Sequence, residues 1–179
     1  MGNFAELCAK RQSCRSFSDK KVEHEKLVKC IEAARLAPSG CNSQPWEFVV
    51  VENEKLVPQI AKCTQELGIN TYTDGASAFI IVLEKHAVLM PKIRGFLDSQ
   101  YFARGDLGAA TLSICLQAAD LGIGTCILGI FNREKICEIL NLPVEATKFF
   151  CVIAVGYPAS DEIRPKIRKP VEEIAKFIQ

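Results

Sequence analysis

The segment that most constrains the fold is residues 106–121, DLGAATLSICLQAADL, in which almost every side chain is apolar or small. The spacing predicts a helix, and its apolar positions leave almost no polar face. A helix that is apolar all round must be buried all round. A domain of this size has little interior in which to hide such a helix. Burial at a subunit interface therefore competes with burial at the centre of a monomer.

Length and charge exclude several classes of protein. A chain of 179 residues is long enough for one sizeable core and too short for two ordinary ones, so we expect a single domain spanning residues 1–179. Hydrophobic residues make up 49% and charged residues 24%, which is typical of a globular protein rather than a disordered or collagen-like chain. The net charge is +1, so no overall field favours nucleic acid or an anionic membrane surface.

The predicted location is the cytoplasm. The apolar stretch at residues 76–83 is far shorter than the roughly 18 residues that span a bilayer, and residues 1–11 contain no hydrophobic signal core. The nine cysteines are scattered without a C-x-x-C pair, which predicts reduced, mostly buried thiols. The two histidines have no second ligand at metal spacing, so we expect no metal site.

Helical and strand-like segments alternate along the chain. Helical spacing predicts helices over 23–36, 106–121 and 132–140, with a further helix capped by Asn53 and carrying Leu56, Ile60, Cys63 and Leu67 on one face. Apolar runs predict strands over 46–52, 78–84, 124–128 and 149–155. Strands without polar alternation are covered on both faces. The predicted class is therefore α/β (α+β), a mixed sheet sandwiched by helices.

The first segment with chemical potential is R-Q-S-C-R-S-F, residues 11–17, which follows a short helix-like stretch at 4–10. If it is extended, Arg11, Ser13 and Arg15 project from one side. Two guanidiniums and a hydroxyl suit a phosphate or a carbonyl-rich ring. The alternative is a solvated basic loop.

The second segment is A-P-S-G-C-N-S-Q-P-W, residues 37–46, a turn-rich loop between a helix and a strand. The amides of Asn42 and Gln44 each offer a donor and an acceptor, which matches the polar edge of a heteroaromatic ring. A plain helix-to-strand connection is the alternative. Cys41 lies in the same loop, where we expect a small residue without a catalytic role.

The third segment is G-I-G-T-C-I-L-G, residues 122–129. Its glycines precede a strand rather than open a helix, so neither a dinucleotide fingerprint nor a P-loop is present. We expect Gly122 to end the preceding helix and Gly129 to mark a close backbone approach at the strand end. Downstream, Arg164, Lys166, Arg168 and Lys169 form a basic cluster that is either solvated or holds a phosphate.

No constellation of serine, cysteine or histidine suggests nucleophilic catalysis. Two separated basic segments instead point to an anionic cofactor that performs the reaction. The motifs, in their order, resemble the FMN-dependent nitroreductase family over nearly the whole chain: R-x-S-x-R, P-S-x-x-N-x-Q-P-W, the apolar strand after D-G-A-S, L-G-x-G-T, V-G-Y-P and K-x-R.

That resemblance implies an intertwined homodimer with two FMN sites at its interface, and a tail, residues 158–179, that reaches the partner subunit. It places Arg11 near the FMN phosphate, Arg15 near the pyrimidine edge, and the strand end beside the flavin N5. No side chain is implied as catalytic, because the flavin carries the chemistry and Arg15 supports its reduced ring. The cofactor-binding residues implied are Arg11, Ser13, Arg15, Pro38, Ser39, Gly40, Asn42, Gln44, Asn70, Leu128, Gly129, Lys166 and Arg168, of which residues 38–42 come from the partner.

The resemblance further implies hydride transfer from NADH or NADPH to FMN, and then to an electron-poor acceptor such as a nitroaromatic or a quinone. Two departures from the family leave the acceptor open. The stretch 84–105 is too short for the helical excursion that covers the flavin in many members, and Leu128 stands where an acid is frequent. A flavin-binding protein without nicotinamide-driven turnover, or other flavin chemistry such as reductive dehalogenation, are the alternatives.

Overall fold

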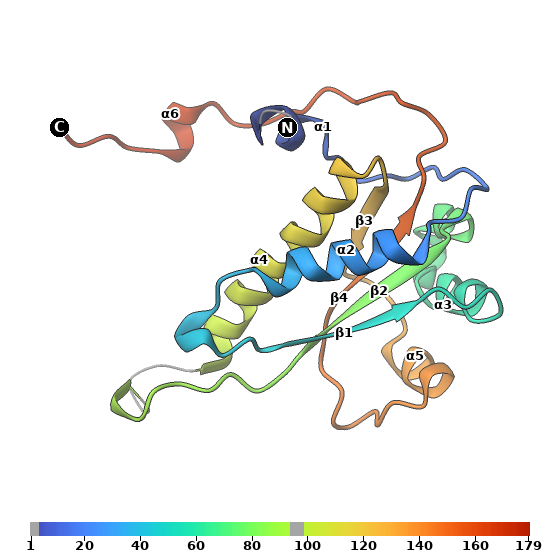
Figure 1. The fold of residues 1–179 in the computed structure, drawn as a ribbon, viewed down its shortest axis with the longest axis horizontal. Coiled ribbons are helices and arrows are strands. Elements are labelled where there is room, and N and C mark those ends of the chain that lie inside the picture. The colour runs from blue at the N-terminus through green and yellow to red at the C-terminus, as the bar shows by residue number, and fades with distance from the viewer. Residues whose placement is uncertain (1–3, 94–98) are drawn as a thin grey trace.

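A four-stranded sheet lies between two layers of helices in the computed structural model, which describes residues 4–93 and 99–179 (Figure 1). The strands lie in the order β1, β2, β4, β3, and all three pairings are antiparallel. Within the described residues, the parallel component expected for a mixed sheet is a single bridge between Ser13 and Thr125, at the outer edge of β3. The strands are β1 (Trp46–Val51), β2 (Ala78–Glu84), β3 (Gly124–Leu128) and β4 (Phe149–Gly156).

The central strands are apolar on both faces because both faces are covered. Ile80 and Val82 of β2 pack with α2 (His24–Arg35) and α4 (Ser99–Asp120). Phe79 and Ile81 point the other way, toward α3 (Val57–Cys63) and α5 (Arg133–Leu140). Successive side chains of a strand point to opposite faces, so a strand covered by two layers has no place for polar residues. The predicted sandwich is confirmed.

The predicted helix after Asn53 ends earlier than expected. Asn53 Oδ1 accepts hydrogen bonds from the backbone of Lys55 at 2.9 Å and of Leu56 at 3.3 Å, forming a turn ahead of α3. Pro58 lies in the first turn of α3. The helix stops at Cys63, and Leu67 is 88% exposed with φ of 59°. The prediction that Leu67 lies on the buried face is therefore wrong.

Helix α4 ends at the position predicted from Gly122. Gly122 has φ of 74°, its N–H donates to Ala119 O at 3.2 Å, and the N–H of Ile123 donates to Ala118 O at 2.8 Å. These two bonds form a Schellman cap, which needs a left-handed residue at the position of Gly122. The chain then turns directly into β3.

Helix α4 is not buried all round in the single chain. Leu107, Ile114 and Ala118 are fully buried against α2 and the sheet, but Leu112 is 50% exposed. The expectation of complete burial is wrong for one chain alone, because the described elements that contact α4, among them α1, α2 and the sheet, leave part of its surface uncovered at Leu112. An apolar strip of α4 therefore remains at the surface.

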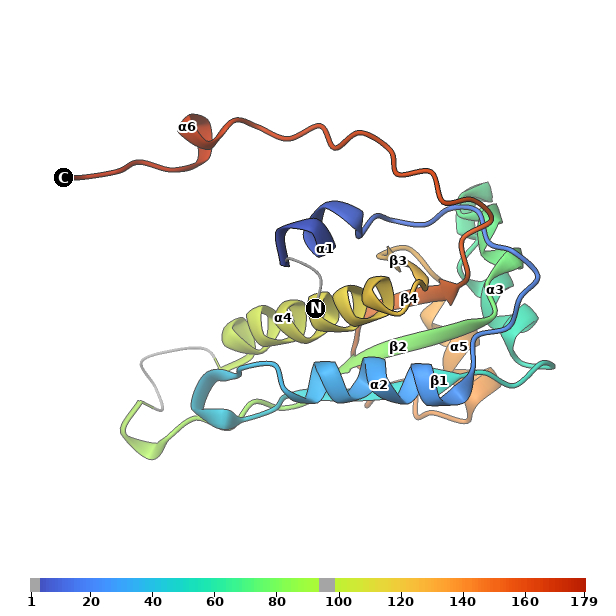
Figure 2. The ribbon, with the colours of Figure 1, turned by 45° about the horizontal axis from the view of Figure 1, so that its top comes forward.

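The N-terminal and C-terminal segments run side by side along one side of the molecule. After α1 (Phe4–Lys10), Phe17 forms an antiparallel bridge with Pro158, and the N–H of Ser18 donates to Tyr157 O at 2.8 Å. The tail then leaves the body and carries the short helix α6 (Val171–Ile174) well away from it (Figure 2). Its apolar side chains Ile167 and Phe177 are 92% and 78% exposed.

Candidate functional site

Five of the predicted cofactor-binding residues, drawn from both of these segments, line one cavity of about 320 Å³. Gln12, Arg164 and Pro165 complete its lining, which contains no carboxylate. We call it the cationic cavity. The five predicted residues are Arg11, Ser13, Arg15, Lys166 and Arg168.

Gln12 holds the two segments of the cationic cavity together. Its Nε2 donates to Glu162 O at 2.7 Å, and its Oε1 accepts from both the backbone N and the Nε of Arg164, each at 3.2 Å. The guanidinium of Arg164 also donates to Ser13 O. The role of Gln12 was missed in the sequence, since a glutamine between two arginines carries no motif. Arg164 donates to neighbouring atoms of the N-terminal segment, whereas Lys166 forms no hydrogen bond to that segment among the described residues.

The cations of the cavity repel one another. The pKa of Lys166 lies below its ordinary value, chiefly because partial burial removes water from the ammonium, and then because Arg11, Arg168 and Arg164 lie nearby. A cluster of uncompensated positive charges is stabilised by an anion that enters it. The geometry and charge of the cavity therefore fit a phosphate, the anionic part of the cofactor implied by the motifs.

Two glycines allow the N-terminal segment to lie this close to the sheet. A Cβ on Gly124 would come within 2.7 Å of Cys14 Cβ, and one on Gly156 within 2.7 Å of Phe17 Cδ1. The N–H of Cys14 can thus reach Thr125 O at 2.8 Å. Only glycine permits such an approach of backbone to side chain.

Gly129 does not have the contact predicted for it. A Cβ built there meets no atom of the described chain within 4 Å, so the close backbone approach expected at this position is absent from that part of the molecule. Leu128 is 3% exposed, and its side chain packs in the core between the sheet and the layer of α3 and α5. Only the backbone of Leu128 is therefore available to a ligand.

Tyr72 joins Asn70 to the cationic cavity. Its hydroxyl donates to Asn70 Oδ1 at 3.1 Å and lies 3.2 Å from Cys126 Sγ. Burial, followed by the Cys126 contact, raises the pKa of Tyr72 to about 12, while the nearby Arg15 guanidinium acts in the opposite direction. Arg15 and Asn70 thus lie around one phenol. Sequence reasoning missed Tyr72, because a tyrosine in a turn carries no motif.

The predicted loop residues Pro38, Ser39, Gly40, Asn42 and Gln44 do not line this cavity. The N–H of Gly40 donates to Asp106 Oδ2 at 3.1 Å, whereas Ala119 of the same helix α4 lines a cavity beside Arg11. At 1.5 Å per residue, helix positions 106 and 119 are about 20 Å apart. One chain therefore holds the two predicted halves of the site at opposite ends of α4.

The loop from residue 38 to residue 44 is strained. Cys41, Asn42 and Gln44 have φ of 54°, 53° and 48°, all in the left-handed region that non-glycine residues avoid. Ser39 Oγ accepts from the backbone of Gln44 at 3.0 Å and helps to fix the loop. Backbone strain of this kind persists where the surroundings enforce it and is frequent at ligand clamps. Residues 40–42 form a 3-10 turn.

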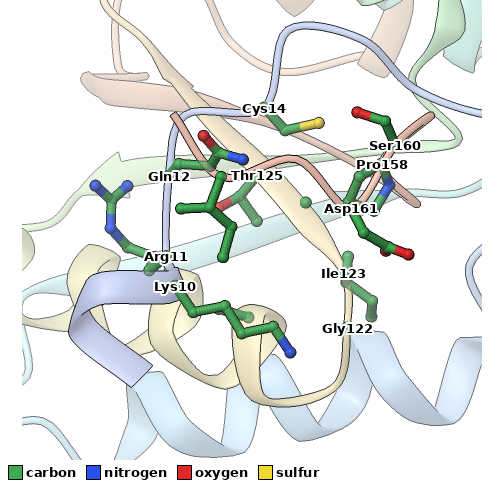
Figure 3. A pocket seen from close by; sticks show the side chains of 13 residues that line it. Lys10, Arg11, Gln12, Cys14, Gly122, Ile123, Thr125, Pro158, Ser160 and Asp161 are labelled. Carbon is green, nitrogen blue, oxygen red and sulfur yellow. The ribbon is translucent and has the colours of Figure 1, made fainter. Parts of the chain in front are cut away.

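A second cavity of about 290 Å³ lies on the other side of the N-terminal segment (Figure 3). Figure 3 shows Lys10 reaching under the tail segment that carries Asp161, while Arg11 points away from Ile123 and Asp161. The segment that carries Arg11 therefore separates a mixed cavity, next to the end of α4, from the cationic cavity. Lys10, Asp161 and Ile123 belong to the first of these.

The described residues contain neither a candidate metal cluster nor a membrane-spanning helix. Across residues 4–93 and 99–179, no cluster of three or more histidine, cysteine, aspartate or glutamate side chains could hold a metal ion. In the same part of the chain, no helix combines the length and the apolar character needed to cross a membrane.

The sequence profile of the nitroreductase family matches residues 8–157. An oxygen-insensitive NADPH nitroreductase of Helicobacter acinonychis is 30% identical over 195 residues, covering 92% of this chain and 91% of that protein. The crystal structure of a nitroreductase family protein from Clostridium difficile has a TM-score of 0.79 at 31% identity and covers 99% of both chains.

A structure from Exiguobacterium sibiricum, solved in complex with FMN, has a TM-score of 0.84 at 22% identity and covers 99% of this chain and 98% of that one. At this identity it shows a shared fold. The family match includes residues 11–15 and the strained loop, residues 38–44, whereas Lys166 and Arg168 of the tail lie beyond it. The chain is a member of the nitroreductase family.

Proposed function

We propose that the protein is an FMN-dependent oxidoreductase that passes hydride from NADH or NADPH to an electron-poor acceptor, a nitroaromatic or a quinone. The observation that carries the proposal is the cationic cavity, in which Arg11, Lys166 and Arg168 converge without a carboxylate. The Helicobacter relative is named an NADPH nitroreductase, and the Exiguobacterium structure contains FMN. Both agree with a phosphate-bearing flavin at this place.

Each part of the site has a distinct role. Arg11, Lys166 and Arg168 hold the flavin phosphate, with Ser13 as a further donor. Arg15 and Asn70, joined through Tyr72, face the pyrimidine edge of the ring. FMN supplies the hydride chemistry when bound. A fixed guanidinium at that edge stabilises negative charge on the ring and so favours its reduction.

The backbone at Leu128 and Gly129 orients the ring. Leu128 is the last residue of the edge strand β3, and Gly129 follows it. Near its start, the same strand forms a bridge from Thr125 to Ser13, in the segment that carries Arg15. Leucine has no ionisable group and glycine has no side chain, so neither residue takes part in proton transfer. The acceptor is a small molecule that occupies the same face of the ring as the nicotinamide.

A second copy of the chain completes the site. The protein acts in the cytoplasm. The loop that carries Pro38, Ser39, Gly40, Asn42 and Gln44 bonds to α4 at Asp106. That position is about 20 Å along the helix from Ala119, which lines a cavity together with Arg11, so the partner's loop supplies these residues. The exposed Leu112 and the projecting tail, residues 158–179, meet the partner. Sedimentation at micromolar protein should give about twice the 19.8 kDa mass of the chain, and a stable monomer that keeps FMN would contradict this arrangement.

The decisive experiment is the visible spectrum of the purified protein. We expect the absorption of bound FMN, anaerobic bleaching by NADH or NADPH, and recovery of the colour when a nitroaromatic is added. A flavin-loaded protein that no nicotinamide reduces would replace the proposal with a flavin-binding protein or with another electron donor. A protein that takes up no FMN would overturn the site itself.

A further inference from the structure

A second basic groove lies at the opposite end of β4 from the cationic cavity, with a volume of about 650 Å³. Lys148 and Phe149 contribute to it from the start of β4, whereas the cationic cavity lies near the end of that strand. Eight residues of strand separate the two places by about 25 Å. Its lining is Glu84, Gln100, Tyr101, Arg104, Phe131, Arg133, Lys148 and Phe149.

The groove carries an excess of positive charge. Three cations, Arg104, Arg133 and Lys148, line it against one carboxylate, that of Glu84. Glu84 Oε1 accepts from Gln100 Nε2 at 2.6 Å, and its Oε2 lies 3.9 Å from Arg104 Nε. Among the described residues, no carboxylate forms an ion pair with Arg133 or Lys148. The groove therefore favours an anion.

The floor of the groove is aromatic. The rings of Phe131 and Phe149 lie 5.4 Å apart at 45°, and both side chains are half-buried. Tyr101 forms the rim and is 78% exposed. Phenylalanine rings that pack against each other can offer a face to a planar ligand, and the arginines of the same lining can hold its anionic group. Aromatic rings and cations are thus combined in a way that a site for a bare inorganic anion does not need.

The groove also lies next to the proposed flavin. Phe131 follows Gly129 by two residues, so their Cα atoms are at most about 7.6 Å apart. A molecule that stacks at the flavin edge near Gly129 can extend into the groove without leaving the surface. The groove is separate from the residues already placed at the phosphate and at the pyrimidine edge.

We infer that this groove binds a planar aromatic group that carries an anionic oxygen group, a phosphate or a carboxylate, and that it holds the outer part of a ligand reacting at the flavin. The inference rests on the proposed function for the position of the flavin, but not for binding to the groove. Two sources have this chemistry: the nucleotide end of the nicotinamide donor, with its 2′-phosphate in NADPH, and an acceptor that carries a carboxylate.

Calorimetry with the full chain tests the groove directly. The probes are 2′,5′-ADP, 4-nitrobenzoate and uncharged adenosine. We expect at least one of the two anions to bind, and its affinity to fall about fivefold in Arg133→Gln or Lys148→Gln and about 20-fold in the double variant, as for exposed charge pairs. Lys135→Gln removes an exposed cation from the same helix as Arg133 but outside the lining, and it should leave binding unchanged.

The two anionic probes distinguish a groove for the nucleotide donor from a groove for the acceptor. Binding of 2′,5′-ADP alone assigns the groove to the nucleotide, and the double variant should then raise KM for NADPH about 20-fold with kcat unchanged and little effect on NADH. Binding of 4-nitrobenzoate alone assigns it to the acceptor, and KM for that acceptor should rise instead. Phe131→Leu should lower the affinity for whichever anion binds, since it removes an aromatic ring on which the ligand stacks.

Binding of neither anion, or equal binding by the double variant and by Lys135→Gln, overturns the inference. Both results are obtained without turnover, so they are independent of the proposed flavin chemistry. Conversely, a protein that binds 2′,5′-ADP through Arg133 and Lys148 but holds no FMN would retain the groove and refute the proposed function.

Discussion

Both polar atoms of the Gln12 side chain form hydrogen bonds with the tail: Nε2 donates to Glu162 O, and Oε1 accepts from Arg164. One neutral side chain thereby holds the segment that carries Lys166 and Arg168 against the segment that carries Arg11. The cations of the cavity are brought together by this contact, since their own charges repel one another.

Replacing Gln12 should release the tail. In Gln12→Ala the hydrogen bonds to Glu162 and Arg164 are lost, each contributing about 0.5–1.5 kcal/mol. We expect faster trypsin cleavage after Lys166, faster hydrogen exchange over residues 160–168, and weaker flavin retention. Gln59→Ala, which removes a surface glutamine bonded to Lys55 O in α3, is the matched control. An unchanged cleavage rate in Gln12→Ala would show that the hydrogen bonds of Gln12 do not hold the tail.

The arginines of the cationic cavity should differ in what their loss changes. Arg11→Ala and Arg168→Ala each remove a charged hydrogen bond to the phosphate, roughly 1.5–3 kcal/mol, and should appear as flavin loss in the ratio of visible to ultraviolet absorbance. Arg15→Ala should keep the flavin but lower its midpoint potential and slow hydride transfer. Equal flavin retention in all three variants, with unchanged kinetics, would remove this assignment of the site.

The affinity for the anion should fall as pH rises, and the fall should begin at a lower pH than deprotonation of an ordinary exposed lysine would give. A bound phosphate favours the ammonium form of Lys166, so binding is strongest below the pKa of that group and falls as pH rises through it. Burial and the neighbouring arginines place this pKa below the ordinary 10.5. Titration of FMN fluorescence between pH 7.5 and about 10.5 should show the decline in the wild type and its loss in Lys166→Arg. Lys169→Arg is the control, and identical profiles for both variants would exclude Lys166 as the titrating group.

Tyr157 should support stability at neutral pH more than in acid. Its hydroxyl donates to Glu23 Oε2 at 2.6 Å and lowers the pKa of Glu23 from 4.5 to about 2. Because the folded pKa lies below the unfolded one, this stabilisation is present above about pH 4.5 and is lost as pH falls toward 2. Thermal unfolding should show a gap between wild type and Tyr157→Phe at pH 7 that narrows at pH 3. A gap of equal size at both values would assign the effect to packing of the ring beside Lys20 and Lys26.

Gly124 should tolerate no side chain. In Gly124→Ala the new Cβ meets Cys14 Cβ at 2.7 Å and Gly156 O at 3.2 Å, so the N-terminal segment must move outward. We expect about 1–3 kcal/mol of lost stability in chemical denaturation, together with flavin loss. Gly105→Ala adds a Cβ with no described atom within 4 Å in helix α4 and should be neutral or stabilising. Equal stability of the two variants would contradict the close approach.

The layers of the fold could be predicted from sequence because they depend on local patterns. The run at 78–84 is apolar on both faces, Asn132 accepts from Lys135 N at 2.9 Å as a helix cap, and Gly122 ends α4 with a left-handed residue. Each of these signals lies within a few residues of its effect. The prediction that placed Leu67 on a helix failed because the chain leaves the helix at Cys63, a boundary without a glycine or proline at that point.

The site was less predictable because its contacts join distant positions. The motifs marked Arg11 and Lys166, and the structure brings both to one cavity. Gln12 and Tyr72 carry no motif, and their roles arise from partners far away in the sequence or from a buried neighbour. Gly124 was passed over in favour of Gly129, since a glycine reports close approach only when the element packed on it is known.

The separation between Gln12 and Glu162, 150 positions along the sequence, sets the order in which the molecule is built. During synthesis, residues 11–15 leave the ribosome long before the segment that must face them, and local helices can form in the meantime. The anion-binding cations can gather only after the tail has been synthesised and has docked beside Gln12. A chain interrupted before Lys166 would keep most of its core and yet have half of its charge cluster, so cofactor uptake would distinguish finished chains from unfinished ones.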